Sequence, residues 1–113
     1  MAVVERNMAK KESYPYLIVW EFHPKKGEES QFEQAYGANG VWATFFKKGE
    51  GFIATQLNRD LKDPTRYLTF DLWMSRQAYE AFCVANHAEY DAIDAQCKAL
   101  TESERELGSF ERL

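Results

Sequence analysis

The sequence predicts an α+β protein of the ferredoxin-like type, a βαββαβ chain whose four-stranded antiparallel sheet carries two helical regions on one face. Segments rich in β-branched and aromatic residues alternate with segments of helical periodicity in that order. A short turn separates the second and third strand-like segments, which predicts a hairpin. Both helical regions are expected on the same face because crossover connections are right-handed. The length of 113 residues suits one domain with one core.

The first strand is predicted over residues 16–22, YLIVWEF, and the His-Pro pair that follows ends it because proline cannot donate to a strand ladder. A turn then leads into a helix, where Ser30 is the expected N-cap and Glu33 completes a capping box. Helical spacing resumes in residues 41–46, VWATFF, with glycines on both sides. These aromatics belong either to the core or, with the glycines as hinges, to a lid over a pocket.

The hairpin is predicted from residues 52–59, FIATQLNR, and residues 66–73, RYLTFDLW, with an Asp-Pro pair at the centre of the turn. Ser75 is the expected N-cap of the long helical region that follows. An Asn-His pair at residues 86–87 marks a kink in that region. The hairpin and the helical region supply the middle of the fold.

The end of the chain predicts one more turn and one more strand. Thr101 and Glu104 repeat the capping-box spacing over a single short turn. Residues 106–113, ELGSFERL, are the expected fourth strand. This strand completes the sheet.

Both faces of the sheet are apolar, which predicts a second copy of the chain. Alternation along the first strand separates two sets of side chains, Tyr16, Ile18, Trp20 and Phe22 on one face and Leu17, Val19 and Glu21 on the other. The second set is expected to share its face with the mixed side of the third strand, Tyr67, Thr69, Asp71 and Trp73. Because one chain has helices for one face only, we expect a homodimer that covers the other. The alternative is a solvated face with scattered apolar residues.

The composition excludes several classes of partner. The net charge is −4 and no basic stripe is present, so nucleic acid is not expected to bind. No apolar run is long enough to span a bilayer, so no membrane association is expected. Residues 1–14 form a polar segment without the pattern of a secretory signal, and we expect a flexible tail, a single domain over residues 15–113 and a cytoplasmic location. The aromatic content of 15% favours a flat-walled ligand pocket.

The cysteines and histidines predict neither a disulfide nor a metal site. Cys83 and Cys97 lie in one helical segment, about 21 Å apart along a continuous helix, whereas disulfide-bonded residues have Cα atoms within about 7 Å. The chain has two histidines and no CxxC motif, so no zinc site is indicated.

Three segments carry a family resemblance, namely YLIVWEFHPKKGEESQFEQAYG, RYLTFDLWMSRQAYEAF and ELGSFERL. Through them, residues 16–113 resemble the antibiotic biosynthesis monooxygenase family. The resemblance implies a dimeric α+β barrel, with a pocket between sheet and helices in each subunit. It also implies a reaction class, because some members oxidise polycyclic aromatic substrates with molecular oxygen and no cofactor. Other members bind and degrade haem.

The haem-degrading branch of the family has an asparagine on the first strand and a tryptophan and a histidine on the second helix. An ungapped count from the shared glycine turn and the strand-end tryptophan brings these positions to Trp20, Phe82 and Ala92. None of the three matches. The resemblance therefore disfavours haem degradation, and we transfer no catalytic residue from that branch.

Two residues are candidates for proton transfer in a cofactor-free oxygenation, which needs a dry pocket, a proton-handling group and aromatic walls. Asp71 lies late in the third strand, and burial without a partner would raise its pKa toward that of a useful base. His87 borders the apolar stripe of the second helical region, and the ordinary pKa of histidine suits proton transfer. The alternatives are an ion pair of Asp71 with an arginine and a structural His87.

The candidate substrate-binding residues are large aromatics and one further carboxylate. They are Trp20, Glu21, Tyr36, Trp42, Phe46, Trp73, Tyr79 and Phe82. Together they predict a pocket for a flat, hydrophobic aromatic molecule. The leading hypothesis is a small monooxygenase that acts on this molecule without a cofactor. The alternative is a dimer of the same fold that binds or senses a small molecule without a reaction.

Overall fold

The computed structural model describes residues 15–113, so the expected tail, residues 1–14, lies outside the described residues. The elements follow in the order β1 (Tyr16–Pro24), α2 (Glu29–Tyr36), α3 (Val41–Phe46), β2 (Phe52–Arg59), β3 (Tyr67–Trp73), α4 (Arg76–Ala85), α5 (His87–Cys97), the 3-10 turn η1 (Lys98–Leu100) and β4 (Thr101–Glu111). Within the part of the chain that the structure describes, no helix is long and apolar enough to cross a membrane.

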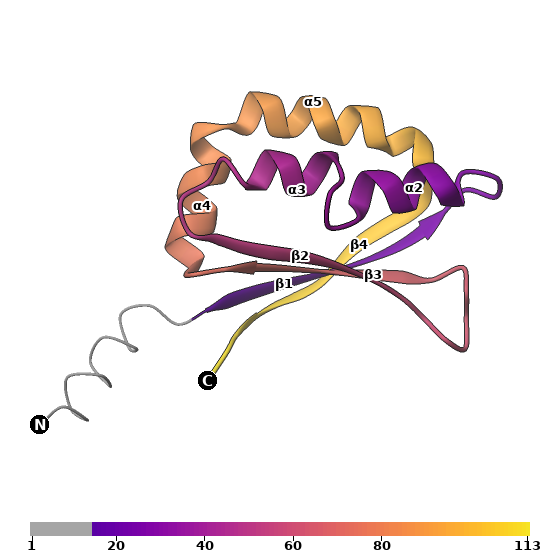
Figure 1. Ribbon diagram of the computed structural model, residues 1–113, viewed down its shortest axis with the longest axis horizontal. Helices are drawn as coiled ribbons and strands as arrows, with labels where there is room; N and C mark the ends of the chain where they lie inside the picture. Colours follow the sequence, from indigo (N-terminus) through magenta and orange to yellow (C-terminus); the bar gives the residue numbers. More distant parts are fainter. Residues whose placement is uncertain (1–14) are drawn as a thin grey trace, which may run out of the picture.

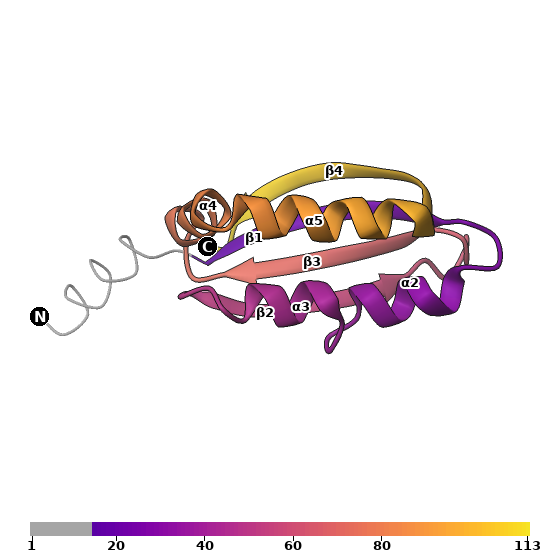
Figure 2. The same ribbon diagram turned by 90° about the horizontal axis from the view of Figure 1, so that it is seen from above.

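The molecule has two layers, with every α-helix on the same face of one four-stranded sheet (Figure 1). The strand order is β2-β3-β1-β4, and all three neighbouring pairs are antiparallel. Seen from above, α5 runs alongside α2 and α3 over the strands (Figure 2). The α+β ferredoxin-like fold expected from the element order is thereby confirmed.

The register of β1 against β3 decides which side chains meet beneath the helices. Ile18 lies opposite Asp71 and Trp20 lies opposite Thr69. Residues directly opposite in an antiparallel pair point to the same face. Asp71 therefore shares the helix-covered face with the aromatic side of β1, and the expectation that it shares a face with Glu21 is wrong. Alternation alone leaves the pairing open, because a slip of one residue exchanges the faces.

The expected cap of the first helix is wrong. The helix begins two residues earlier than predicted, so Ser30 lies inside its first turn, and the N-cap residue, Glu28, makes no side-chain capping bond. In the turn before the helix, the backbone N–H of Gly27 donates to Glu29 Oε1 at 2.8 Å. A glutamate in the first turn also suits the positive end of the helix dipole.

The turn expected at Thr101 and Glu104 is wrong as well, because both residues belong to β4. β4 begins five residues before the predicted strand and pairs with β1 along its length, as far as Pro24 opposite Thr101. β1 accordingly runs through the His-Pro pair. The long-range pairing of two strands outweighs one local capping bond, since the paired strands gain a ladder of backbone hydrogen bonds and Thr101 is buried.

The middle of the chain folds as predicted. β2 and β3 form the hairpin. Ser75 caps α4, and its hydroxyl accepts the Ala78 N–H at 3.1 Å. The kink falls at Asn86, the residue between α4 and α5.

The aromatic core lies between the sheet and the helices, and Trp73 is its largest fully buried side chain, with 0% of its surface exposed. Its indole packs against the rings of Phe46 and Phe82, with centroids 5.7 and 5.4 Å away. Gly49 lies over this cluster, where an added Cβ would come within 2.7 Å of Trp73 and Phe82. The glycine after α3 therefore permits close packing on the core.

Among residues 15–113, no helix covers the opposite face of the sheet (Figure 1). The register brings Leu17, Leu72 and Phe110 together on this face, and 52% of the Phe110 surface is exposed. Glu21 lies on the same face opposite Arg105. We call this surface the open face.

Candidate active site

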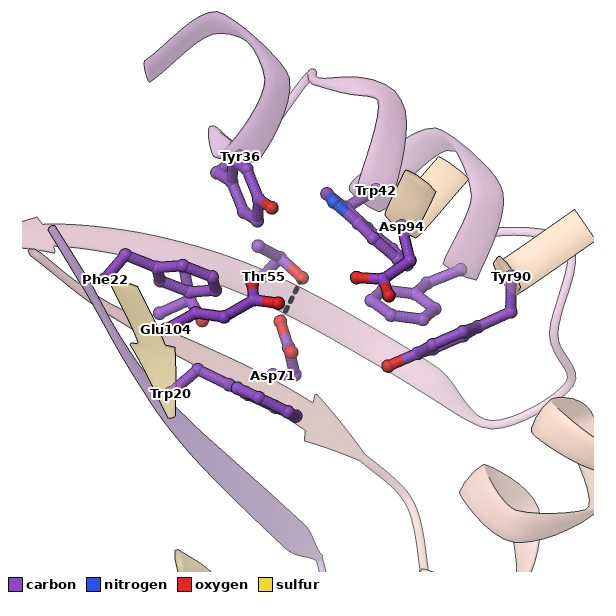
Figure 3. Close-up of a pocket in the computed structure, with 11 residues that line it drawn as sticks. Trp20, Phe22, Tyr36, Trp42, Thr55, Asp71, Tyr90, Asp94 and Glu104 are labelled. Carbon is purple, nitrogen blue, oxygen red and sulfur yellow. Dashed lines mark hydrogen bonds between the residues drawn. The ribbon is translucent and has the colours of Figure 1, made fainter. Parts of the chain in front are cut away.

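A cavity lies between the helix-covered face of the sheet and helices α2, α3 and α5 (Figure 3). Its walls are formed by six aromatic and five polar residues, Trp20, Phe22, Tyr36, Trp42, Phe46 and Tyr90, and Thr55, Thr69, Asp71, Asp94 and Glu104. Its volume is about 50 Å³. That space holds a few water molecules and is smaller than the roughly 150 Å³ cavity that takes up a benzene ring.

Asp71 is the buried carboxylate of the cavity, with 8% of its surface exposed. The Thr55 hydroxyl donates to Asp71 Oδ1 at 2.7 Å, a bond drawn in Figure 3. Burial raises the pKa of Asp71 to about 6, and the hydrogen bond from Thr55 opposes that rise. A carboxyl group with this pKa is an effective proton acceptor near neutral pH.

Two further carboxylates, Asp94 of α5 and Glu104 of β4, line the cavity and are half-buried. Burial is the main cause that raises the pKa of Glu104, the nearby charge of Asp94 adds to the rise, and Lys98 opposes it. None of the three cavity carboxylates forms an ion pair with another described residue. The cavity is therefore negatively charged at its polar end when these groups ionise.

Hydrogen-bond donors also face the cavity. Burial raises the pKa of Tyr36 and of Tyr90, so both phenols keep their protons at neutral pH. Trp42 is 7% exposed, and its indole N–H is buried without a hydrogen-bond partner within residues 15–113. The indole lies near the Tyr36 hydroxyl and the Cys97 thiol, but its N–H makes a well-aligned bond to neither.

The structure brings five of the ten predicted site residues together at the cavity: Asp71, Trp20, Tyr36, Trp42 and Phe46. They come from β1, β3, α2 and α3, so the fold is required to assemble them. Three of the other predicted residues, Trp73, Tyr79 and Phe82, pack around one another in the core beside α4 and do not line the cavity.

The remaining two predicted residues lie elsewhere. His87 is exposed at the first residue of α5 and does not line the cavity. Glu21 faces the open face, where both its carboxylate oxygens accept hydrogen bonds, one from Arg66 and one from Arg105. These two bonds lower the pKa of Glu21, so it has the opposite electrostatic environment to Asp71.

Sequence reasoning missed six residues of the cavity wall: Phe22, Thr55, Thr69, Tyr90, Asp94 and Glu104. Tyr90 and Asp94 are four residues apart on α5, a helical spacing that the sequence contains. Glu104 could not be predicted as part of the cavity wall, because the sequence pattern placed it in a turn and not in a strand. Within residues 15–113, no group of three or more His, Cys, Asp or Glu side chains is placed to hold a metal ion.

Comparisons with known proteins give a family and several neighbours in fold. The sequence model of the antibiotic biosynthesis monooxygenase family matches residues 15–90, which is more than half of the chain. No curated protein sequence gives a significant match.

Three solved structures illustrate the likeness in fold. SnoaB, a cofactor-independent oxygenase from Streptomyces nogalater, is similar with a TM-score of 0.65 and 18% identity, over 88% of this chain and 94% of that chain. PA3566 from Pseudomonas aeruginosa has a TM-score of 0.64 and 15% identity, over 89% of this chain and 96% of that chain. A conserved protein from Methanosarcina mazei has a TM-score of 0.66 and 10% identity, over 88% of this chain and 94% of that chain. At these identities the likeness is one of fold.

Proposed function

Because this chain belongs to the antibiotic biosynthesis monooxygenase family, we propose that it is a monooxygenase that oxidises a flat aromatic molecule with molecular oxygen and no cofactor. The observation that carries the proposal is Asp71. It is a buried carboxylate with a pKa raised to about 6, and it lines a cavity with aromatic walls. A base of this kind is what the first step of such a reaction requires.

In the proposed reaction, the Asp71 carboxylate takes a proton from an activated CH₂ group that is conjugated with a carbonyl through an aromatic ring, as in an anthrone. The resulting delocalised anion transfers one electron to O₂, and the radical and superoxide combine to form a carbon–oxygen bond. Asp71 then returns its proton to the peroxide. Loss of the second C–H proton supplies the electron pair of the C=O bond as the O–O bond breaks, and the hydroxide that leaves takes up this proton to become water. The CH₂ group and O₂ thus give a ketone and water, with one oxygen atom in each product. Walls that exclude water protect the anion until it meets O₂.

The size of the cavity limits how the substrate lies. The free space of about 50 Å³ is smaller than the roughly 150 Å³ that takes up a benzene ring, so we propose that the wall side chains move apart as the reacting ring enters between Asp71 and the aromatic walls. The rest of a polycyclic substrate would then lie at the mouth, which the half-buried Asp94 and Glu104 border. Single-ring substrates are therefore expected to react, in addition to polycyclic ones.

Oxygen uptake by the purified, metal-free protein tests the proposal. With a panel of anthrones, we expect uptake above the rate without protein, because the site supplies a base and a dry aromatic pocket. Mass spectrometry with ¹⁸O₂ is expected to place one labelled oxygen atom in the anthrone product. Uptake at the protein-free rate across the panel would instead favour a dimer that binds or senses a small molecule.

We also propose that a second copy of the chain covers the open face. The apolar side chains of Leu17, Leu72 and Phe110 support this proposal, since the solvated face of an antiparallel sheet usually carries polar residues. The Glu21 cluster with Arg66 and Arg105 would fix how the two copies meet.

The substitution Phe110→Glu is expected to weaken the dimer about tenfold or more, because it puts a charge where two copies meet. Sedimentation equilibrium of wild type and variant measures the change. Val84→Glu, on α4 in the helical layer and 77% exposed, is the matched control and is expected to leave the dimer intact. A monomeric wild type, or equal association of Phe110→Glu and wild type, would contradict the proposal.

A further inference from the structure

The charge of the cavity has a consequence for the molecule it takes. Three of its lining residues are carboxylates, and no lysine, arginine or histidine among residues 15–113 lines it. The positive charge of Lys98 acts on Glu104, but Lys98 is exposed and does not line the cavity. A buried carboxylate without a counter-charge is costly, and a cation in the cavity would remove that cost.

A second, independent feature of the cavity also points to a ligand. The Trp42 side chain is more than nine-tenths buried, and its indole N–H makes no well-aligned hydrogen bond within residues 15–113, although the Tyr36 hydroxyl and the Cys97 thiol lie close to it. Figure 3 shows the nitrogen end of this ring turned toward Tyr36 across the cavity. Buried donors are almost always satisfied in folded proteins, so an oxygen of a bound molecule is the natural acceptor.

The aromatic walls favour the same kind of ligand. The rings of Trp42 and Tyr90 meet edge to face with centroids 5.1 Å apart, and Trp20 and Phe22 stack at 6.3 Å on the strand side. Flat faces of this kind attract organic cations as well as neutral rings. Aromatic walls with carboxylates at one end are the arrangement that recognises amines.

We infer that the cavity selects an oxygenated aromatic amine, with Asp94 and Glu104 holding the positively charged amine and the Trp42 indole N–H donating to the oxygen on the ring. The inference deepens the proposed function, on which it rests for the ring and the site, by naming the charge of the substrate. Aromatic carboxylic acids of the same size are rejected, because their carboxylate would meet the three carboxylates of the wall.

Three probes with the same phenol ring and different charges test the inference: tyramine, tyrosol and 4-hydroxyphenylacetate. The chain has three tryptophans, so ¹⁵N-labelled protein gives three indole N–H signals in its NMR spectrum. The variant Trp42→Phe identifies the signal of Trp42, and the enclosed Trp73 serves as an internal reference. Titrations follow the Trp42 signal, so binding is measured without any reaction.

Tyramine is expected to shift the Trp42 signal and to bind about tenfold more tightly than 4-hydroxyphenylacetate, with tyrosol between them. The double variant Asp94→Asn/Glu104→Gln is expected to bring the three affinities within about threefold. Glu102→Gln, an exposed glutamate on the same strand as Glu104, is the matched control and is expected to keep the order.

Equal binding of tyramine and tyrosol would overturn the inference. It would also be overturned by a preference for tyramine that survives in the double variant, or by the absence of any shift with all three probes. Each of these results is distinguishable from a failure of the proposed function, which is measured by oxygen uptake on neutral anthrones. Oxygen uptake on anthrones, together with equal binding of the three probes, would support the proposed monooxygenase and contradict only the selection of an amine.

Discussion

Replacing Asp71 with asparagine is expected to lower kcat/KM for oxygen uptake by about 10²–10⁴-fold. Asparagine keeps the size of the side chain and can still accept the hydrogen bond from Thr55, which Asp71 receives at 2.7 Å. It cannot take a proton from the substrate. The loss should therefore appear in kcat as well as in kcat/KM, because the proton transfer belongs to the reacting complex and not to binding.

The pH profile of the wild type gives a sharper form of this prediction. Since the pKa of Asp71 is raised to about 6 and the base must be ionised, kcat/KM is expected to rise with pH and to level off above that value. The Asp71→Asn variant should lose this rise. Asp91→Asn, the same change at an exposed position of α5, is the control and should keep both rate and profile.

Two results would contradict the role of Asp71. An Asp71→Asn variant with the rate of the wild type would remove it from the chemistry. A His87→Ala variant that loses the rise near pH 6, while Asp71→Asn keeps it, would return the role to the histidine expected from the sequence. His87 lies outside the cavity wall, so we expect its substitution to change neither.

The same substitution, Asp71→Asn, is expected to raise the free energy of unfolding at pH 7 by roughly 2 kcal/mol. The physical reason is that folding moves this carboxyl into the core, where 8% of its surface remains exposed and its charged form is disfavoured. An amide has no charge to desolvate. Chemical denaturation of the wild type and the variant, followed by circular dichroism, measures the difference.

The stabilisation depends on pH in a direction that follows from the pKa. The folded pKa of Asp71, about 6, lies above its ordinary value of 3.8, so the folded state holds the proton more firmly than the unfolded state between these values. This group therefore makes the wild type less stable as pH rises through that window, and its effect is constant above it. The advantage of Asp71→Asn should disappear near pH 4.

The exposed control Asp91→Asn should change the stability by less than about 0.5 kcal/mol. An Asp71→Asn protein that is less stable than the wild type at pH 7 would mean that the carboxylate is stabilised in the fold, contrary to its raised pKa. Gain of stability together with loss of activity is the expected signature of a functional buried charge.

The fold was predictable because its signals are periodic and long. The run from Tyr16 and the hairpin strands show the composition of strands, and Ser75 precedes a helical stripe at the position where a cap is needed. The errors fell where a local pattern competed with a distant partner. Thr101 has capping-box spacing with Glu104, but it pairs with Pro24 of β1, and only the folded chain shows that pairing.

The sequence predicted the type of site better than the residues that form it. Asp71 was recognisable as a carboxylate in a strand rich in aromatic residues, and the aromatic walls of its pocket were predicted from composition and alternation. Glu21 stood out for the same reason, yet the register turns it to the open face and onto two arginines. A single residue of register separates a candidate base from an ion pair, and no property of one strand in isolation determines that register.

The position of β1 between β3 and β4 bears on how the chain matures during synthesis. β1 is translated long before β4. For most of the synthesis of the chain, the edge of β1 that later pairs with β4 therefore has no partner strand. Unpaired strand edges are prone to associate with other chains, and contacts between distant segments form slowly. The cavity is likewise incomplete until β4 arrives with Glu104. A nascent chain paused before residue 101 should therefore depend on chaperones to stay soluble.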